Sequence, residues 1–353
     1  KWYNTNTYLD FGKDIFPSML EMGLYLKGYR SFEYIKDCGT PSRLDKVLKD
    51  FKSGKINRAK LSLKGKAVFI DRDGTINEEV NHLSEINLFK LIPKSDEAIK
   101  LFNLNEYRTC VVTNQPVIAR GDCSINELSE IHKKMETLLG NKGAYIDRIY
   151  YCPHHPDSGF EGELKNYKKK CNCRKPNVGM ILKATAELNI DLSSSWFIGD
   201  STSDVLAAKN SGIKSILVET GYAGLDGKYN ISPDFVSRDL FNAAKFITSD
   251  FGLIYNYIKG IFSNYQRQKI IRIGGLSKSG KTTFSNVLKF FLKDKGLTVH
   301  LISIDRWIKN LKDRSKTVIG RYDIAEIKSF IDLISANKNK EIQTKLPYYN
   351  KIE

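Results

Sequence analysis

The sequence predicts an α/β protein with a doubly wound parallel sheet, followed by a second, partial α/β unit. Short apolar runs of strand length recur along residues 61–250, and each run ends in polar side chains. Amphipathic helical patterns lie between these runs, as the crossover connections of parallel strands require. A glycine-rich loop pattern begins at residue 275, after a further apolar run, and it indicates the second unit.

The elements of the central unit can be placed one by one. The runs expected as buried strands are 66–70, 109–112, 196–198 and 215–218, and the helical patterns are 95–104, 125–139 and 178–188. In open parallel sheets, ligands bind at the carboxyl ends of the strands. The polar residues that follow the runs are therefore candidates for a site: Asp71, Asp73, Thr113, Asn114, Gln115 and Asp200.

Length and composition exclude several classes of protein. The 353 residues predict more than one domain, and a hydrophobic content of 41% is enough for real cores. The apolar runs are much shorter than the roughly 20 residues of a membrane span, so no membrane partner is expected. No secretory segment follows Lys1, which favours the cytoplasm. We expect divisions at 1–60, 61–250 and 266–353.

The net charge of +16 leaves the partner open. It fits nucleic acid, an acidic membrane surface or phosphorylated small substrates, and it also fits lysines scattered over solvated faces. The dense Lys168–Lys170 run lies beside a pair of cysteines.

The carboxylates at the strand ends predict phosphoryl chemistry. Asp71 and Asp73, joined by Asp200 from another strand, would form an oxygen site for Mg²⁺. We expect Asp71 to attack a phosphoryl group, and Asp73 to act as acid for the leaving oxygen and then as base for water. Thr113 and the backbone amides after it would hold the phosphate, while Lys175 would neutralise its charge.

A second cluster predicts zinc. Cys152 and His154 are separated by one residue, and Cys171 and Cys173 follow with the same spacing. Three thiolates and an imidazole form a closed tetrahedral set for structural Zn²⁺. The alternative is a pair of reduced surface cysteines with an unrelated histidine. The remaining thiols, Cys38, Cys110 and Cys123, are expected in the core or on the surface.

The ordered motifs DRDGT, TNQ, CRKP and GDSTSD resemble those of the haloacid dehalogenase (HAD) phosphatase superfamily over about residues 61–250. The CPHHP and CNCRKP stretches resemble its zinc-containing branch, which includes phosphatases of D-glycero-D-manno-heptose 1,7-bisphosphate and of histidinol phosphate. The resemblance implies that Asp71 is the nucleophile and a magnesium ligand, Asp73 the acid/base and Asp200 a further ligand.

The resemblance also implies how a substrate is held. Phosphate contacts would come from Thr113, Asn114, Gln115, Arg174 and Lys175, and sugar contacts from the loop of Glu79, Val80, Asn81 and His82. The zinc ligands would be Cys152, His154, Cys171 and Cys173. Asp204 matches the end of the fourth motif, but a carboxylate at the start of a helix explains it equally well.

Two spacings narrow the expected substrate. Only about forty residues separate Asp73 from Thr113, too few for a large cap domain, so a small phosphosugar is expected. The sixteen residues between His154 and Cys171 form a longer gap than we associate with the histidinol-phosphate enzymes, which favours a heptose bisphosphate.

The C-terminal pattern Gly275–Thr282 predicts a nucleotide site, with ATP or another nucleoside triphosphate as ligand; the alternative is a glycine-rich turn. The residues expected to bind it are Gly275, Ser279, Gly280, Lys281, Thr282 and Thr283. Strands are expected at 270–273 and 300–304. The second would end at Asp305, which resembles the acceptor-site carboxylate of uridine kinase-like enzymes. Too few residues follow for such a kinase, so a truncated domain is expected.

The N-terminal residues 29–41 resemble the closing segment of sugar-1-phosphate nucleotidyltransferases, where Asp37 would match a metal ligand. The glycine-rich loop of that family is absent, so residues 1–60 would be an inactive remnant. The alternative is a turn before an amphipathic helix.

The three resemblances together suggest part of a multi-enzyme protein for nucleotide-activated heptose, used in lipopolysaccharide or capsule. The rival is a polynucleotide 3′-phosphatase/5′-kinase, which the positive charge would suit. The zinc motif and the nucleotidyltransferase-like tail disfavour a nucleic-acid partner. A non-enzymatic scaffold would leave Asp71 and Asp73 without a role.

Overall fold

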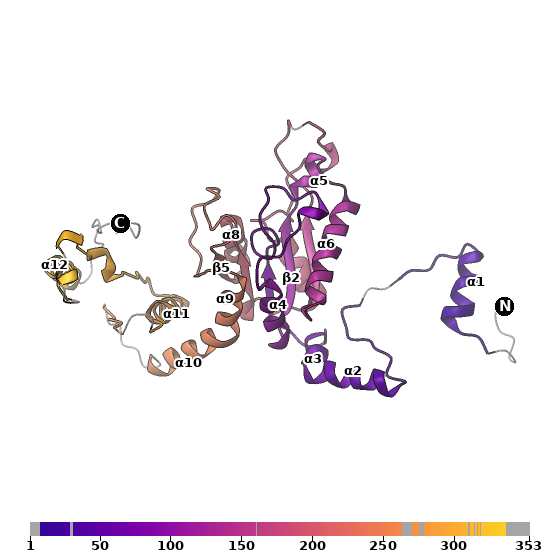
Figure 1. Cartoon of the computed structure of the whole chain (residues 1–353), viewed down its shortest axis with the longest axis horizontal. Coiled ribbons are helices and arrows are strands. Elements are labelled where there is room, and N and C mark those ends of the chain that lie inside the picture. Colours follow the sequence, from indigo (N-terminus) through magenta and orange to yellow (C-terminus); the bar gives the residue numbers. More distant parts are fainter. Residues whose placement is uncertain are drawn as a thin grey trace.

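The computed structural model describes residues 8–28, 31–159, 161–262, 270–274, 279–309, 311–313, 315, 317 and 319–336. At its centre lies a six-stranded parallel sheet in the order β3-β2-β1-β4-β5-β6 (Figure 1). The strands are β1 (Ala67–Ile70), β2 (Arg108–Asn114), β3 (Arg148–Cys152), β4 (Trp196–Gly199), β5 (Lys214–Val218) and β6 (Phe235–Ser237). Phe69 of β1 pairs with Cys110 of β2 and Phe197 of β4.

Helices cover both faces of the sheet, because successive side chains of each strand point to opposite faces. Val68 and Ile70 face one core and Phe69 faces the other. The first core is closed by α4 (Ser95–Leu104), α6 (Ile125–Gly140) and α9 (Leu240–Lys245), and the second by α7 (Gly179–Leu188) and α8 (Thr202–Asn210). The strand order reverses between β1 and β4, so the carboxyl ends of these strands flank the expected crevice.

The structure confirms the predicted α/β class with a parallel sheet. Strands form at all four predicted runs, and helices form at all three predicted patterns. The prediction missed β3 and β6. β3 is mostly half-buried rather than an apolar run, and β6 has three residues at the sheet edge.

Local sequence signals set several helix starts. Ser124 and Glu127 form a reciprocal capping box at the start of α6. α5 (Pro116–Arg120) begins with proline, which needs no hydrogen bond there. The shorter helical turns are Phe11–Ile15, Ile86–Leu88, Lys165–Tyr167, Leu192–Ser194, Phe246–Asp250, Ile304–Trp307, Leu311–Asp313 and Ile319–Arg321.

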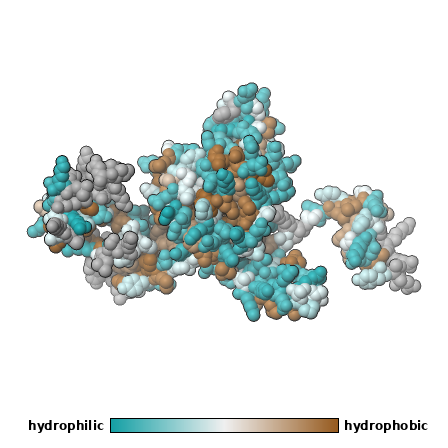
Figure 2. All heavy atoms as spheres, in the orientation of Figure 1, coloured by the Kyte–Doolittle hydropathy of each residue, from teal (hydrophilic) through white to brown (hydrophobic). Residues whose placement is uncertain are grey.

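The N-terminal segment contains α1 (Phe16–Glu21), α2 (Pro41–Lys52) and α3 (Lys55–Arg58), of which α1 lies apart from the sheet (Figure 1). Figure 2 shows apolar surface on α1, where Leu20 is exposed. The end of the segment docks against the sheet domain. Buried Arg58 pairs with Asp147 at 3.2 Å. The guanidinium of Arg108 donates to the backbone carbonyls of Arg58, Lys60, Leu63, Leu188 and Asn189.

The C-terminal helices are α10 (Phe251–Ile261), α11 (Lys281–Asp294) and α12 (Ile324–Ala336). α11 packs on the sheet domain, since Phe290 contacts the rings of Phe235 and Phe251. Among the described residues, no helix has both the length and the hydrophobicity of a membrane span.

The strands predicted at 270–273 and 300–304 are not formed. Residues 270–273 belong to no strand, and the second stretch ends in the Ile304–Trp307 turn. A strand needs a neighbour to satisfy its backbone hydrogen bonds, and the described part of this segment provides none.

Candidate active site

A buried ion-pair cluster lies at the carboxyl ends of β1 and β4. The Nζ atom of Lys175 is 2.8 Å from Oδ1 of Asp71 and 2.6 Å from Oδ1 of Asp204. Burial and the charge of Asp204 raise the pKa of Asp71 to about 7, although Lys175 opposes the shift. The cluster therefore holds more negative charge than its one lysine balances.

Asp200 enters the same cluster from the end of β4. Its Oδ2 accepts a 2.7 Å hydrogen bond from the backbone of Tyr222, and burial beside Asp71 and Asp204 raises the pKa of Asp200 to about 9. Gly74 and Gly221 lie so close that a Cβ atom at either position would overlap the Asp200 carboxylate. Both glycines also have positive φ, which explains their residue type.

The side chains that cluster differ in one member from the predicted magnesium site. Carboxylate oxygens of Asp71, Asp200 and Asp204 lie within 4.8 Å of one another, and all three residues are buried. The carboxylate of Asp73 is not part of this group. Three buried oxygen donors that repel one another fit a hard divalent cation such as Mg²⁺, because the cation would offset the repulsion.

Asp204 caps a helix and also lies in the carboxylate cluster. Its Oδ2 accepts hydrogen bonds from the backbone and the hydroxyl of Ser201, which caps α8, at 3.1 and 2.6 Å. Its Oδ1 faces Lys175. The helix cap thus fixes the carboxylate that belongs to the cluster.

Asp73 is held by a separate network of donors. Its carboxylate accepts from Arg72 at 2.9 Å, from Asn77 at 2.9 Å and from Gln115 at 2.8 Å. Burial opposes ionisation, yet Arg72, Asn77 and Gln115 hold the pKa of Asp73 below its usual range. Asp73 therefore differs from Asp71 and Asp200, whose pKa values are raised by burial and by neighbouring carboxylates.

The TNQ residues at the end of β2 connect these groups. Gln115 donates to Asp73 and, at 2.9 Å, to the hydroxyl of Thr113. Asn114 fixes the backbone of Lys175: its Oδ1 accepts from the Lys175 amide at 2.9 Å, and its Nδ2 donates to the carbonyl at 3.2 Å. Asn114 thus holds the segment that carries the lysine.

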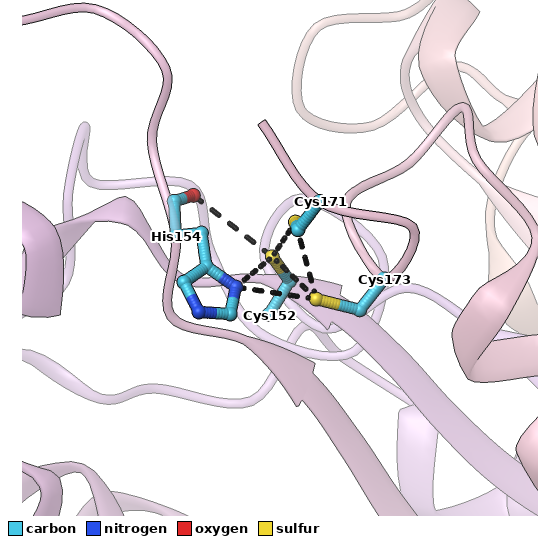
Figure 3. A group of neighbouring side chains, drawn as sticks. All are labelled: Cys152, His154, Cys171 and Cys173. Atoms are coloured by element: carbon cyan, nitrogen blue, oxygen red, sulfur yellow. Dashed lines mark hydrogen bonds between the residues drawn. The ribbon is translucent and has the colours of Figure 1, made fainter. Parts of the chain in front are cut away.

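The four predicted zinc ligands converge (Figure 3). The Sγ atom of Cys152 is 3.5 Å from that of Cys171 and 3.2 Å from that of Cys173, and Nδ1 of His154 is 3.3 Å from Cys173 Sγ. A tetrahedral Zn²⁺ with bonds of about 2.3 Å spaces neighbouring sulfurs by about 3.8 Å. The donors and their spacing therefore fit zinc after a small expansion.

The thiol cluster is directly connected to the phosphate-side residues. Arg174 and Lys175 follow Cys173 in the chain, and Arg174 donates to the backbone carbonyl of His154 at 3.1 Å. Cys152 is the last residue of β3, and its carbonyl accepts from the amide of Gln115 at 2.8 Å. The position of the cluster therefore constrains both the lysine and the β2 end.

Comparisons with known proteins identify the central unit. A family model described as HAD-hydrolase-like matches residues 172–243. The chain is 43% identical over 157 residues to the D-glycero-β-D-manno-heptose-1,7-bisphosphate 7-phosphatase of Pasteurella multocida, which covers 44% of this chain and 83% of that protein. The chain belongs to the HAD-like phosphatases.

Other HAD-like phosphatases are similar to about the same length of this chain. The D-glycero-D-manno-heptose-1,7-bisphosphate 7-phosphatase of Thermosynechococcus vestitus is 35% identical over 188 residues, covering 51% of this chain and 94% of that protein. A solved D,D-heptose 1,7-bisphosphate phosphatase from B. bronchiseptica, complexed with magnesium and phosphate, is 31% identical with a TM-score of 0.45, covering 51% of this chain and 96% of that one. By sequence, the likeness to the two heptose-bisphosphate phosphatases of P. multocida and T. vestitus extends over about half of the chain.

The predicted sugar loop of this HAD-like phosphatase lies beside Asp73. Glu79 accepts from the amide of Asn81 at 2.6 Å, and burial, together with the charge of Asp73, raises the pKa of Glu79. Asn81 and His82 both have positive φ, and Val80 is exposed. The loop is thus fixed by its own hydrogen bond, and its sugar contacts stay a prediction.

The predicted nucleotide site is only partly described. Gly275 lies outside the described residues, and so do 276–278. Gly280 has a φ of 80°, and α11 begins at Lys281, where the pattern places the helix that contains Thr282 and Thr283. Ser279 lies just before that glycine. Asp305 accepts from the Tyr322 hydroxyl at 3.3 Å, and its acceptor role stays a prediction.

Two residues near Asp73 escaped the sequence analysis. Arg72, between the two aspartates, is fully buried, and His132 of α6 contacts it. The available signal was a charged residue two positions after the end of a buried strand and a histidine one residue after core Ile131.

Proposed function

We propose that the central unit is a Mg²⁺-dependent phosphatase that removes the C7 phosphate of D-glycero-D-manno-heptose 1,7-bisphosphate. The observation that carries this proposal is the buried cluster of Asp71, Asp200 and Asp204 with Lys175. It lies in a unit that is 43% identical over 157 residues to a heptose-bisphosphate phosphatase. The relatives' names supply the substrate, and the cluster supplies the chemistry.

The reaction proceeds in two displacements at phosphorus. A carboxylate oxygen of Asp71 bonds to phosphorus while the bond to the sugar oxygen breaks, and that oxygen takes a proton from Asp73. Asp73 must first take up this proton when the anionic substrate binds, because its pKa without substrate lies below the usual range. Water then attacks the phosphorus of the aspartyl phosphate and gives its proton to Asp73, which releases inorganic phosphate and restores Asp71. The ammonium of Lys175, held 2.8 Å from Asp71, is placed to balance charge on the phosphoryl oxygens.

Mg²⁺ would be held by Asp71, Asp200 and Asp204, and it supplies charge neutralisation for phosphate and carboxylates together. Asp73 was also predicted to bind Mg²⁺, but its carboxylate is held by Arg72, Asn77 and Gln115. The atom that it could still offer to the cation is its backbone carbonyl oxygen. Zn²⁺ would be held by Cys152, His154, Cys171 and Cys173 as a closed structural site that positions Arg174 and Lys175.

Phosphate release tests this function directly. The substrates are both anomers of heptose 1,7-bisphosphate, histidinol phosphate and a 3′-phosphorylated oligonucleotide, each with Mg²⁺. We expect turnover of a heptose bisphosphate and its loss in Asp71→Asn. Release from histidinol phosphate or from the oligonucleotide alone would replace the proposed substrate, and equal activity of the variant would overturn the nucleophile.

We further propose that residues 266–353 bind a nucleoside triphosphate. The support is the Gly275–Thr282 pattern, together with α11 starting at Lys281 as the pattern predicts. Nucleotide binding measured by calorimetry should be lost in Lys281→Ala and kept in Lys293→Ala, a matched change at the exposed end of the same helix. Equal binding by both variants would contradict the assignment.

The multi-enzyme context extends this proposal. The Asp37–Pro41 stretch and the C-terminal pattern support a cytoplasmic protein that combines nucleotidyltransferase, phosphatase and kinase segments for activated heptose. Asp37 accepts from the amide of Gly39 at 2.8 Å and pairs with Arg43, so its carboxylate is already engaged. Asp37→Ala should therefore leave phosphate release by the central unit unchanged.

A further inference from the structure

A buried histidine stands behind the network that holds Asp73. His132 lies on α6, outside every motif used above, and only 7% of it is exposed. Its Nε2 is 3.2 Å from Nη1 of Arg72, and its ring lies against that of Tyr151, with 5.8 Å between the centroids. The histidine touches neither Asp71 nor Asp73 through any hydrogen bond given by the structure.

Arg72 connects this histidine to Asp73. The guanidinium is fully buried and grips the Asp73 carboxylate through Nε at 3.1 Å and Nη2 at 2.9 Å. Nη2 also donates to Oε1 of Gln115 at 3.0 Å. One edge of the planar fork is thus occupied by Asp73, and His132 contacts the remaining terminal nitrogen.

The direction of the His132 contact follows from the chemistry of arginine. A guanidinium has donors and no acceptor, so Nε2 of His132 must accept, which requires a neutral ring. Burial and the nearby Arg72 charge lower the pKa of His132 to about 3, consistent with a neutral ring. A neutral acceptor fixes the Arg72 plane without competing for the charge of Asp73.

We propose that His132 is a positioning residue, which orients the Arg72 guanidinium so that the Asp73 carboxylate points correctly for proton exchange with the leaving oxygen. The proposal rests on the acid/base role proposed for Asp73. The guanidinium contacts three side chains: Asp73, Gln115 and His132. Without the contact to His132, the guanidinium could rotate in its plane, and the Asp73 carboxylate bound to it would move as well. Proton transfer depends steeply on such geometry.

The test compares His132→Met with His132→Gln. Both replacements are unbranched, but only glutamine offers an oxygen acceptor near the position of Nε2. We would measure kcat and KM for heptose bisphosphate, whose leaving alkoxide needs a proton, and for p-nitrophenyl phosphate, whose leaving phenolate hardly does. Thermal unfolding of each variant reports whether the fold is kept.

We expect the methionine variant to lose about tenfold in kcat/KM on the sugar phosphate, with KM unchanged, and much less on p-nitrophenyl phosphate. The glutamine variant should recover most of that loss. An equal loss on both substrates, or no recovery by glutamine, would overturn the positioning role.

Asp73→Asn separates this proposal from the function on which it rests. A loss concentrated on the sugar phosphate in Asp73→Asn, with no such pattern in His132→Met, overturns the role of His132 alone. An equal loss on both substrates in Asp73→Asn overturns the acid/base assignment, and the His132 proposal with it.

Discussion

Two clusters of potential metal ligands at the carboxyl edge of the sheet differ in how well their negative charge would be balanced. The carboxylates of Asp71, Asp200 and Asp204 repel one another in a buried space, and Lys175 offsets only part of their charge. The Cys152 cluster offers four soft donors, which one Zn²⁺ would satisfy completely. The excess negative charge of the carboxylate cluster suits a reactive site, and the complete ligand set of the Cys152 cluster suits a structural site.

The two clusters are joined by a very short piece of chain. Cys173 is a predicted zinc ligand, and Lys175, two residues later, faces Asp71. Asn114 holds the Lys175 backbone from the end of β2. Changes in each cluster should therefore have separable effects on chemistry and on architecture.

The largest effect is expected for Asp71→Asn. An amide cannot form the aspartyl phosphate, so phosphate release should fall by at least about 10³-fold. Zinc content should be unchanged, and stability without Mg²⁺ should rise because one repelling charge is removed. The matched control is Asp250→Asn, at an exposed position, which should keep full activity. Loss of zinc in Asp71→Asn would show that the two clusters are not separable.

The next effect is expected for Cys173→Ala. Three ligands bind zinc less tightly than four, so bound zinc, measured by elemental analysis, should fall below one per chain. Activity should fall by about 10- to 100-fold, because a displaced Lys175 stabilises the phosphoryl group less well. Cys38→Ala, at an exposed thiol outside the cluster, is the control. Full activity of a variant without bound zinc would show that zinc does not position Lys175.

A smaller effect is expected for Asn114→Ala. The change removes both side-chain hydrogen bonds to the Lys175 backbone, at a cost of about 1–3 kcal/mol in the free energy of unfolding. We expect kcat/KM to fall several-fold while bound zinc stays at one per chain. A fall in zinc content equal to that of Cys173→Ala would show that Asn114 supports the thiol cluster instead.

The smallest effect concerns pH. The pKa values of Asp71 and Asp200 are raised in the folded chain, to about 7 and about 9. Their contribution to stability is therefore fully present at low pH and is lost as pH rises toward and through these values. Mg²⁺ binds the ionised forms, so the gain in Tm on adding Mg²⁺ should be larger at pH 8 than at pH 5. An equal gain at both pH values would place the cation elsewhere.

The sequence predicted the elements that repeat a simple pattern. β1, β2, β4 and β5 are buried apolar runs, and a parallel sheet needs their backbone pairing regardless of side-chain detail. β3 escaped because its half-buried residues and terminal cysteine suggested a ligand loop, and its place at the sheet edge depends on distant pairing with β2. The strand predicted at 270–273 was wrong for the same reason: an apolar run does not form a strand unless another strand pairs with it.

The site shows a similar division. Motif order predicted that Asp71, Lys175 and Asp200 would meet. The two aspartates do so because the strands that they follow, β1 and β4, end at the same edge of the sheet. The separate network of Asp73 could not be predicted, since it depends on the burial of Arg72, which also contacts His132 of α6. Such contacts are set by helix placement, which residue spacing does not encode.

The buried guanidinium of Arg108 bears on how this protein can be divided. It donates to backbone carbonyls at the end of α7 and to those of Arg58, Lys60 and Leu63, which precede β1. A fragment that starts at residue 61 would strand part of this donor set in a dry interior. We therefore expect a fragment that keeps α3 (Lys55–Arg58) to be more stable than one that starts at residue 61.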